Sequence, residues 1–256
     1  MNKQDLFKLT GKVAIVTGGM RGLGYAIAVN LAKFGADIVI ADIEMKAAEK
    51  IKKEFTNLNR KSYFIKTDVS NSQDVNHMVK ETMNKFGRID ILVNNAGITK
   101  RGPALSIKEK DWNRIIAVNL KGVFLCSQAA GKEMKKQKKG KIINVASIAG
   151  QIGLLNTLPY CASKGGVIQI TRALAVEWAK YNINVNAIAP TVFETPLTKP
   201  VLENEKEFHD YVIERIPLGR FGKPNDLAGA IVFLASDASD FVTGHILNID
   251  GGWLAA

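Results

Sequence analysis

A glycine-rich turn between a short apolar run and an amphipathic run most constrains how this chain folds. Residues 12–17 are mostly apolar and β-branched, which predicts a buried parallel strand. The turn spans residues 18–24, and apolar residues at helical spacing follow over residues 25–34. Gly22 and Gly24 would let the backbone approach a pyrophosphate at the positive end of that helix. Strand, glycine-rich turn and helix in this order predict a dinucleotide-binding α/β fold.

An acidic residue ends the next predicted strand. Residues 37–41 lead into Asp42, about twenty positions beyond the glycines. A carboxylate there is placed to accept hydrogen bonds from both ribose hydroxyls of the adenosine, and it would repel a 2′-phosphate. The sequence therefore favours NAD over NADP, although Arg21 in the turn is a cation that could pair with that phosphate. The alternative role of Asp42 is to cap a helix that starts at Ile43.

Strands and helices alternate along the rest of the chain. Further strands are predicted over residues 62–66, 89–93, 141–146, 183–188 and 246–249. This alternation indicates an α/β fold with a doubly wound parallel sheet of about seven strands and helices on both faces. The 256 residues contain no internal repeat or linker, which predicts one domain over residues 1–256. Residues 191–220 are polar and rich in proline and charge, and we expect them to form a substrate lid.

Local signals predict several helix boundaries. Ser70 with Gln73, and Ser106 with Glu109, have the spacing of capping boxes that open helices. Gly87 is expected to end the first of these two helices.

The stretch from Ser147 to Lys164 carries residues suited to proton transfer. Pro159 fits the first turn of a helix, and Tyr160 and Lys164 are then four positions apart on one face. A phenol has a pKa near 10, and an ammonium group about 4 Å away contributes on the order of 4 kcal/mol, worth roughly three pKa units. That shift brings the phenol toward the range in which it exchanges a proton with a substrate oxygen, and Ser147 could bind the same oxygen. Taken alone, the pair also fits an ordinary amphipathic helix.

The chain is basic, with 35 Lys and Arg against 24 Asp and Glu and a formal net charge of +11. Such a charge could serve a nucleic acid or an acidic partner. The lysines are scattered over predicted helix surfaces except in residues 132–141, where cations offset the dipole at a helix C-terminus and Gly140 suits the position after it. Because no aromatic residues interleave with that run, we expect no nucleic-acid binding.

The remaining composition points to a reducing compartment. No apolar run approaches the length needed to cross a bilayer, and residues 1–12 lack the apolar stretch of a signal peptide. We therefore expect no membrane association and a cytoplasmic location. Cys126 and Cys161 match no disulfide framework or metal spacing, so we expect them to pack as small apolar side chains and predict no metal site.

Five motifs occur in one order along the chain. They are Thr17-Gly18-x-x-x-Gly22-x-Gly24, Asn94-Asn95-Ala96-Gly97, Asn119, Ser147 and Tyr160-x-x-x-Lys164. In this combination the chain resembles the short-chain dehydrogenase/reductase family over nearly its whole length. The resemblance implies a single Rossmann-type domain, a nicotinamide cofactor, hydride transfer to or from a substrate carbon and, commonly, a homotetramer.

The resemblance also implies a role for each catalytic residue. Tyr160 would act as general acid and base, and Ser147 would orient the substrate carbonyl. Lys164 would hold the nicotinamide ribose and lower the pKa of Tyr160. Asn119 would anchor a water in a proton relay, which would explain an Asn in the interior of a predicted helix, where it is locally unfavourable.

Cofactor contacts are expected in the glycine-rich turn and at the carboxyl ends of the strands. Asp68 is placed to meet the adenine amino group or, alternatively, to stabilise a turn. One departure from the family is visible, because Thr191 follows Pro190 where the family usually has glycine; a Thr adopts positive φ only at a cost and would narrow the pocket. The predicted cofactor residues are Gly18, Arg21, Gly22, Leu23, Gly24, Asp42, Asp68, Val69, Asn95, Ala96, Gly97, Tyr160, Lys164, Pro190, Val192 and Thr195.

Within the family, residues 177–180, 216–220 and 250–255 look like the branch of gluconate 5-dehydrogenases and 2-deoxy-gluconate or 2-keto-3-deoxy-gluconate dehydrogenases. This likeness implies an NAD-dependent oxidoreductase that interconverts the carbonyl and the secondary alcohol of a small sugar acid or polyol. Arg101 could bind a substrate carboxylate through two parallel hydrogen bonds, or lie in a solvated loop. The predicted substrate residues are Ser147, Arg101 and Tyr160.

Two other functions stay open. A 3-oxoacyl carrier-protein reductase could use residues 132–141 to dock an acidic carrier, but such reductases usually prefer NADP, which Asp42 disfavours. A nucleotide-binding regulator without catalysis would have no need of all four residues Asn119, Ser147, Tyr160 and Lys164.

Overall fold

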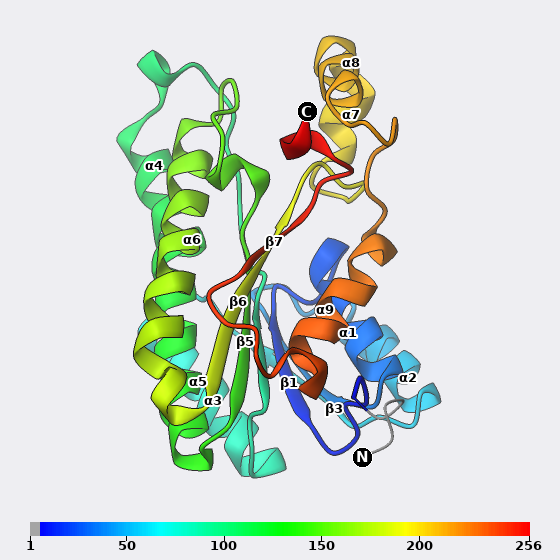
Figure 1. The fold of residues 1–256 in the computed structure, drawn as a ribbon, viewed down its shortest axis with the longest axis vertical. Helices are drawn as coiled ribbons and strands as arrows, with labels where there is room; N and C mark the ends of the chain where they lie inside the picture. Colours follow the sequence, from blue (N-terminus) through cyan, green and yellow to red (C-terminus); the bar gives the residue numbers. More distant parts are fainter. Residues whose placement is uncertain (1–5) are drawn as a thin grey trace.

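The computed structural model describes residues 6–256, so the first five residues of the segment examined for a signal peptide lie outside it. Over the described range, seven parallel strands form one sheet in the order β3-β2-β1-β4-β5-β6-β7 (Figure 1). The strands are β1 Val13–Thr17, β2 Asp37–Asp42, β3 Ser62–Lys66, β4 Ile91–Asn94, β5 Gly140–Val145, β6 Ile183–Pro190 and β7 Ile246–Ile249. The prediction of a parallel, doubly wound sheet is confirmed.

Helices cover both faces of the sheet (Figure 1). One face carries α1 Gly22–Lys33, α2 Ala48–Asn57 and α9 Ala228–Ala235, and the other carries α3 Ser72–Phe86, α4 Glu109–Ile116, α5 Gly122–Gln137 and α6 Leu158–Trp178. Two short helices, α7 Lys199–Asn204 and α8 Lys206–Glu214, lie beyond the carboxyl ends of the strands. Among the described residues no helix is long and apolar enough to span a membrane.

Alternate side chains of the central strands fill two separate cores. In β1, Ala14 and Val16 pack with α1, whereas Val13 and Ile15 pack with the helices of the other face. Because both faces are covered, both sets of side chains must be apolar, which is why the strand reads as a continuous hydrophobic run in the sequence. The strand order reverses between β1 and β4, so the chain leaves a crevice at their carboxyl ends, where ligands of such sheets bind.

A buried polar network holds the catalytic half of the sheet to its helices. Asn94 at the end of β4 donates to Ser127 of α5 at 2.9 Å and to Asn144 of β5 at 2.8 Å. Asn144 in turn donates to Thr171 of α6 at 2.9 Å. In a low-dielectric interior, hydrogen bonds of this kind fix the relative positions of the elements that they join.

Neither predicted capping box forms. Asn71, not Ser70, caps α3 by accepting from the backbone N–H of Gln73 at 2.8 Å, because the Ser70 hydroxyl is bonded to Asp68. Gly87 does end this helix in the left-handed conformation, as predicted.

Two other boundaries differ from the prediction. Ser106 lies in a separate 3-10 turn with its hydroxyl on a local carbonyl, and α4 begins at Glu109 itself. At the end of α5, Lys138 takes the left-handed position expected of Gly140, which instead begins β5.

Candidate active site

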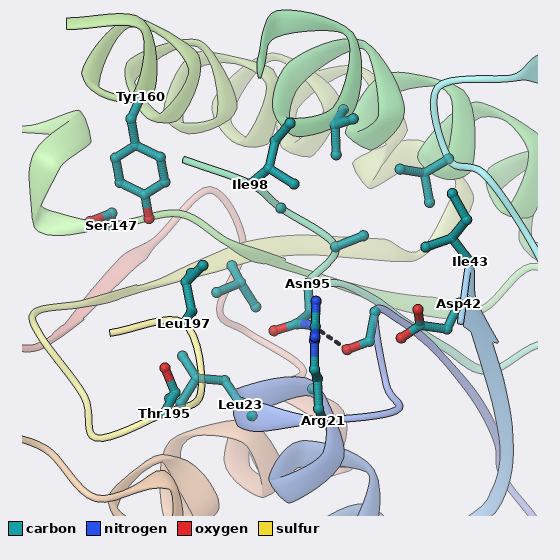
Figure 2. A pocket seen from close by; sticks show the side chains of 18 of the residues that line it. Arg21, Leu23, Asp42, Ile43, Asn95, Ile98, Ser147, Tyr160, Thr195 and Leu197 are labelled. Atoms are coloured by element: carbon teal, nitrogen blue, oxygen red, sulfur yellow. Dashed lines mark hydrogen bonds between the residues drawn. The ribbon is translucent and has the colours of Figure 1, made fainter. Parts of the chain in front are cut away.

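A pocket of about 590 Å³ lies across the carboxyl ends of the strands. Figure 2 shows its two ends: the Tyr160 hydroxyl points toward Ser147 at one, and Asp42 and Arg21 lie at the other. The predicted site residues that line it are Gly18, Arg21, Gly22, Leu23, Gly24, Asp42, Asp68, Val69, Asn95, Ala96, Gly97, Ser147, Tyr160, Lys164, Pro190 and Thr195. Residues widely separated in sequence thus meet in one elongated cavity.

The glycine-rich turn is shaped for a close backbone approach. A Cβ on Gly24 would lie 2.1 Å from the carbonyl oxygen of Gly18 and 2.4 Å from Nδ2 of Asn95, so only glycine fits. The same Asn95 amide donates to the carbonyls of Thr17 and Gly18 at 2.9 and 3.0 Å, which fixes the turn against the end of β4. Gly22 has φ of +57°, and a Cβ there would lie 3.7 Å from Cβ of Thr195, in ordinary van der Waals contact.

The N-terminus of α1 suits a pyrophosphate. No side chain caps this helix at Arg21, and its first residues line the pocket. Uncapped N–H groups and the positive end of the helix dipole together form an anion site. The cavity, the glycine cradle and this helix terminus fit a dinucleotide.

Asp42 is held in place by the backbone around it. Its Oδ2 accepts from the N–H of Met20 in the turn at 3.0 Å, and its Oδ1 accepts from the N–H of Glu44 at 3.1 Å. The next helix begins only at Ala48, so the alternative in which Asp42 caps a helix from Ile43 is wrong. The carboxylate is therefore fixed at the pocket with part of its surface exposed.

The end of the pocket near Asp42 is also lined by residues 67–70, in the loop that follows β3. Oδ1 of Asp68 accepts from both the N–H and the hydroxyl of Ser70, at 2.9 and 2.7 Å. Asp68 thus forms the turn that the alternative interpretation predicted, and it also borders the pocket. Val69 packs closely against Gly122, where a Cβ would lie 2.9 Å from its methyl group, so this wall also requires a glycine.

The catalytic end combines residues from β5, α6 and β6. Pro159 lies in the first turn of α6, as predicted, and the helix then presents Tyr160 to the pocket. Ser147 follows β5, and its hydroxyl accepts from the N–H of Ala149 at 3.1 Å and donates to the carbonyl of Pro190 at 3.4 Å. The Ser147 and Tyr160 hydroxyls therefore face the same space, where one substrate oxygen could contact both (Figure 2).

The prediction that Lys164 lowers the pKa of Tyr160 is wrong for this structure. Burial raises the pKa of Tyr160 above its ordinary value, and the hydrogen bond with Ser147 only partly opposes that shift. The Lys164 Nζ lies 5.6 Å from the centre of the Tyr160 ring and donates to the carbonyl of Val145 at 2.6 Å. Burial lowers the pKa of Lys164 to about 8. Loss of hydration is thus the largest influence on the pKa of both groups, and for Tyr160 it favours the neutral phenol.

Asn119 lies outside the pocket lining but touches its wall. It sits in a π-helical turn, residues 117–121, between α4 and α5. Its Oδ1 accepts from the N–H of Ile98 at 2.9 Å, and its Nδ2 donates to the carbonyl of Ile98 at 2.9 Å and to Ser163 of α6 at 3.2 Å. The Asn119 side chain, which is locally unfavourable within a helix, therefore holds the segment after β4 against α6. Single π-helical turns often occur at functional sites.

Arg101 and Val192 are the other predicted residues that do not line the pocket. The guanidinium of Arg101 pairs with Glu205 at 2.8 Å and stacks on the ring of Phe208 in α8, 4.1 Å from its centre. It is thus partly exposed and already paired, and it is not free for a substrate in this structure. Val192 packs with the apolar cluster beneath α8, which includes Trp253.

The segment predicted as a lid forms the outer wall of the pocket. Thr195, Leu197 and Thr198 line the cavity on the side opposite Tyr160, and α7 and α8 follow them (Figure 2). Leu197 is 57% exposed, so this wall presents an apolar side chain beside the cavity.

Sequence reasoning missed a further set of lining residues. Ile43 and Thr67 lie one or two positions after a predicted strand, so position at a carboxyl strand end was the available signal for these two. The missed residues include Ile43, Thr67, Ser70, Ile98, Arg114, Val118, Val145, Phe193, Leu197 and Thr198.

The cysteines are placed largely as expected. Cys126 is buried in the core between the sheet and α5, and burial raises the pKa of its thiol to about 12. Cys161 is half-buried beside Thr157. Over residues 6–256, no group of three or more His, Cys, Asp and Glu side chains is placed to hold a metal ion.

Known proteins resemble this chain over its full length. Residues 18–254 match the family model described as Enoyl-(Acyl carrier protein) reductase, a model of the short-chain dehydrogenase type. The chain is 46% identical to the 2-dehydro-3-deoxy-D-gluconate 5-dehydrogenase of Escherichia coli, with 97% of this chain and 98% of the relative covered. It is also 43% identical to the 3-oxoacyl-[acyl-carrier-protein] reductase FabG of Thermotoga maritima, covering 96% and 98%.

Solved structures agree with this likeness. A gluconate 5-dehydrogenase from Burkholderia cenocepacia, in complex with NADP and tartrate, superposes with a TM-score of 0.94 at 39% identity, covering 98% of each chain.

Proposed function

The chain belongs to the short-chain dehydrogenase/reductase family of oxidoreductases that act on CH–OH groups, and from this premise we propose that it interconverts a keto-sugar acid and its alcohol with NAD(H). The observation that carries the proposal is the shared pocket, with Ser147 and Tyr160 at one end and Asp42 at the other (Figure 2). A nicotinamide dinucleotide bound there supplies or accepts the hydride.

The protein's own residues supply position and the proton. During reduction the neutral Tyr160 phenol donates its proton to the substrate oxygen, while the Ser147 hydroxyl holds that oxygen by a hydrogen bond. The raised pKa of Tyr160 suits this direction, since the phenol is protonated at neutral pH. Asn119 keeps the segment after β4 against α6, and in the proposed relay it also anchors a water.

The preference for NAD rests on Asp42. Its fixed carboxylate can accept from two ribose hydroxyls, and it opposes a 2′-phosphate at the same place. Arg21 also lines this end and favours the phosphate. The Burkholderia relative was solved with NADP, so the preference is a proposal for this chain alone.

A sugar-acid substrate is supported by the relatives that act on gluconate derivatives. The rival, an acyl-carrier-protein reductase, has a relative of similar identity. Its proposed docking run at residues 132–141 leads into the start of β5, whereas Ser147 follows the end of that strand. The six residues of β5 place the basic run about 20 Å from Ser147, so a carrier docked on that run would lie at the amino ends of the strands, opposite the pocket.

Arg101 remains the proposed partner of the substrate carboxylate. Glu205 already occupies its guanidinium, so the substrate would have to take the place of Glu205. Glu205 is half-exposed, and exposed ion pairs of this kind contribute only about 0–1 kcal/mol, which makes the exchange inexpensive.

We also propose a homotetramer, as the family resemblance implied. Within residues 6–256 the last strand, β7, pairs only with β6 and leaves its outer edge unpaired, and such an edge is available to a second copy. Sedimentation velocity at several protein concentrations would test this, and a single monomeric species would refute it.

The test of the function is the loss of absorbance at 340 nm as the purified protein consumes NADH. The substrates to compare are 5-keto-D-gluconate, a 3-deoxy-keto-uronate and an acetoacetyl thioester, each repeated with NADPH. We expect turnover of a keto-sugar acid with NADH. Turnover of the thioester with NADPH would instead assign the protein to the acyl reductases and refute the roles given to Asp42 and to the sugar acid.

A further inference from the structure

Thr191 lies next to the reacting centre. It follows Pro190, the last residue of β6, whose carbonyl oxygen accepts the Ser147 hydroxyl at 3.4 Å. Its own N–H donates to the carbonyl of Ile249 at 3.2 Å, so β7 fixes its backbone. Thr191 therefore borders the catalytic end of the pocket from a rigid strand end.

The backbone accepts a threonine here without strain. Thr191 is not among the described non-glycine residues with positive φ, so the expected cost of replacing the family's usual glycine does not arise. β-branched residues such as threonine are favoured in the extended backbone conformation of strands. The side chain thus adds a hydroxyl and a methyl group to the pocket wall where the family usually has neither.

The hydroxyl of Thr191 lacks a partner. Its Oγ1 is shielded from solvent and makes no hydrogen bond, a state shared over residues 6–256 only by Asn94 Oδ1 and Arg101 Nε among buried side-chain atoms. A buried, unpaired hydroxyl is unfavourable compared with the same group bonded to a ligand. A change of χ1 to another staggered rotamer moves the hydroxyl to a different side of Cβ, and because no hydrogen bond is lost, the hydroxyl can turn to a polar group in the pocket.

We propose that the Thr191 hydroxyl binds a hydroxyl group of the substrate on a carbon beside the reacting carbonyl, and so selects polyhydroxylated substrates. The inference rests on the proposed sugar-acid function. Ser147 and Tyr160 hold the carbonyl oxygen itself, and Thr191, one residue beyond the partner of Ser147, is placed for the neighbouring carbon. A site built to bind a hydroxyl discriminates against substrates that lack it.

The test compares two six-carbon acids with a ketone at the same carbon: 5-keto-D-gluconate, and 5-oxohexanoate, which has none of its hydroxyls. Thr191→Val removes the hydroxyl and keeps the shape, whereas Thr191→Ser keeps the hydroxyl. We expect Thr191→Val to lower kcat/KM for 5-keto-D-gluconate about tenfold and to leave that for 5-oxohexanoate within about twofold. Thr191→Ser should retain wild-type discrimination within about threefold.

The affinity for NADH alone, measured by fluorescence without substrate, should be the same in all three proteins. A tenfold weaker affinity for NADH in Thr191→Val would show that the hydroxyl serves the dinucleotide, and equal losses on both acids would show a mere packing role; either result overturns the inference. If the wild-type protein reduces no keto-sugar acid, the proposed function fails and the inference fails with it. If the wild type is active and Thr191→Val matches it, the inference alone fails.

Discussion

Replacing Asp42 by Asn should change the choice between NADH and NADPH. The carboxylate is fixed by the N–H groups of Met20 and Glu44 at 3.0 and 3.1 Å, so it cannot swing away from a 2′-phosphate. Two unit charges about 5 Å apart interact by about 3 kcal/mol at an effective dielectric near 20, and partial exposure with salt reduces this toward about 1–2 kcal/mol. Removing the charge should therefore raise kcat/KM for NADPH about five- to thirtyfold.

The same change weakens the binding of NADH. Hydrogen bonds from the ribose hydroxyls to a charged acceptor contribute about 1.5–3 kcal/mol, of which the amide oxygen of Asn retains a part. We expect kcat/KM for NADH to fall about tenfold, so that the ratio of the two specificity constants shifts about fifty- to three-hundredfold in total. Initial rates at 340 nm with each cofactor, together with the affinity of the free protein for each by fluorescence, measure the shift.

Glu44→Gln is the matched control. It also removes one negative charge, but from a side chain two residues after Asp42 that does not line the pocket. It should leave the ratio within about twofold, since an exposed charge farther from the phosphate is screened. Adding Arg21→Ala to Asp42→Asn should cancel much of the gain with NADPH. The reasoning is refuted if Asp42→Asn leaves the ratio unchanged, or if Glu44→Gln shifts it equally.

Four further changes test other parts of the site. Tyr160→Phe should lower kcat about 10²- to 10⁴-fold in steady-state assays while the fluorescence-measured affinity for NADH stays within about threefold, because it removes only the proton donor; unchanged kcat would contradict that role. Gly24→Ala should weaken NADH binding more than tenfold and lower Tm by several degrees in a calorimetric scan, because its Cβ would lie 2.1 Å from a backbone oxygen of the turn. If the substrate carboxylate replaces Glu205, Arg101→Ala should raise KM for a keto-sugar acid and Glu205→Gln should lower it. Equal shifts of KM in the same direction in the two variants would mean that Arg101 only holds the lid segment. The pKa of Lys164 is about 8 in the folded protein against 10.5 in the unfolded chain, so between these pH values the unfolded state binds more protons. The free energy of unfolding should therefore rise by up to about 3 kcal/mol as the pH increases through this range. Urea unfolding from pH 8 to 10 should show this rise in the wild type and lose it in Lys164→Met.

The sheet and the glycine-rich turn were predictable because their signals are local. β1 is buried on both faces, so its sequence is continuously apolar, and Gly24 has no room for a side chain. The helix pattern after residue 158 likewise brought Tyr160 and Lys164 to one face, and both line the pocket. In each case neighbours in the sequence determine the geometry.

What escaped prediction depends on contacts between distant segments. The sign of the shift in the pKa of Tyr160 depends on how much water the folded pocket excludes, which no spacing of residues reveals. Arg101 is paired with Glu205, 104 positions away, and α3 begins one residue later than expected because Asp68 binds the hydroxyl of Ser70 first. Even the position of Asn119 in a π-turn follows from its bonds to Ile98.

The strand order also has a consequence for how such enzymes diversify. Asp42 and Asp68, which line the proposed adenosine end of the pocket, both precede residue 70. Ser147, Tyr160 and Thr191 all come from β5 onward, and the two groups meet along the pairing of β1 with β4. A single recombination event within α3 would therefore exchange the part that selects the dinucleotide and preserve the part that selects the substrate. Cofactor preference and substrate preference share one cavity but are encoded in separate parts of the gene. A chimera joined at α3 would have the cofactor preference of one parent and the substrate preference of the other.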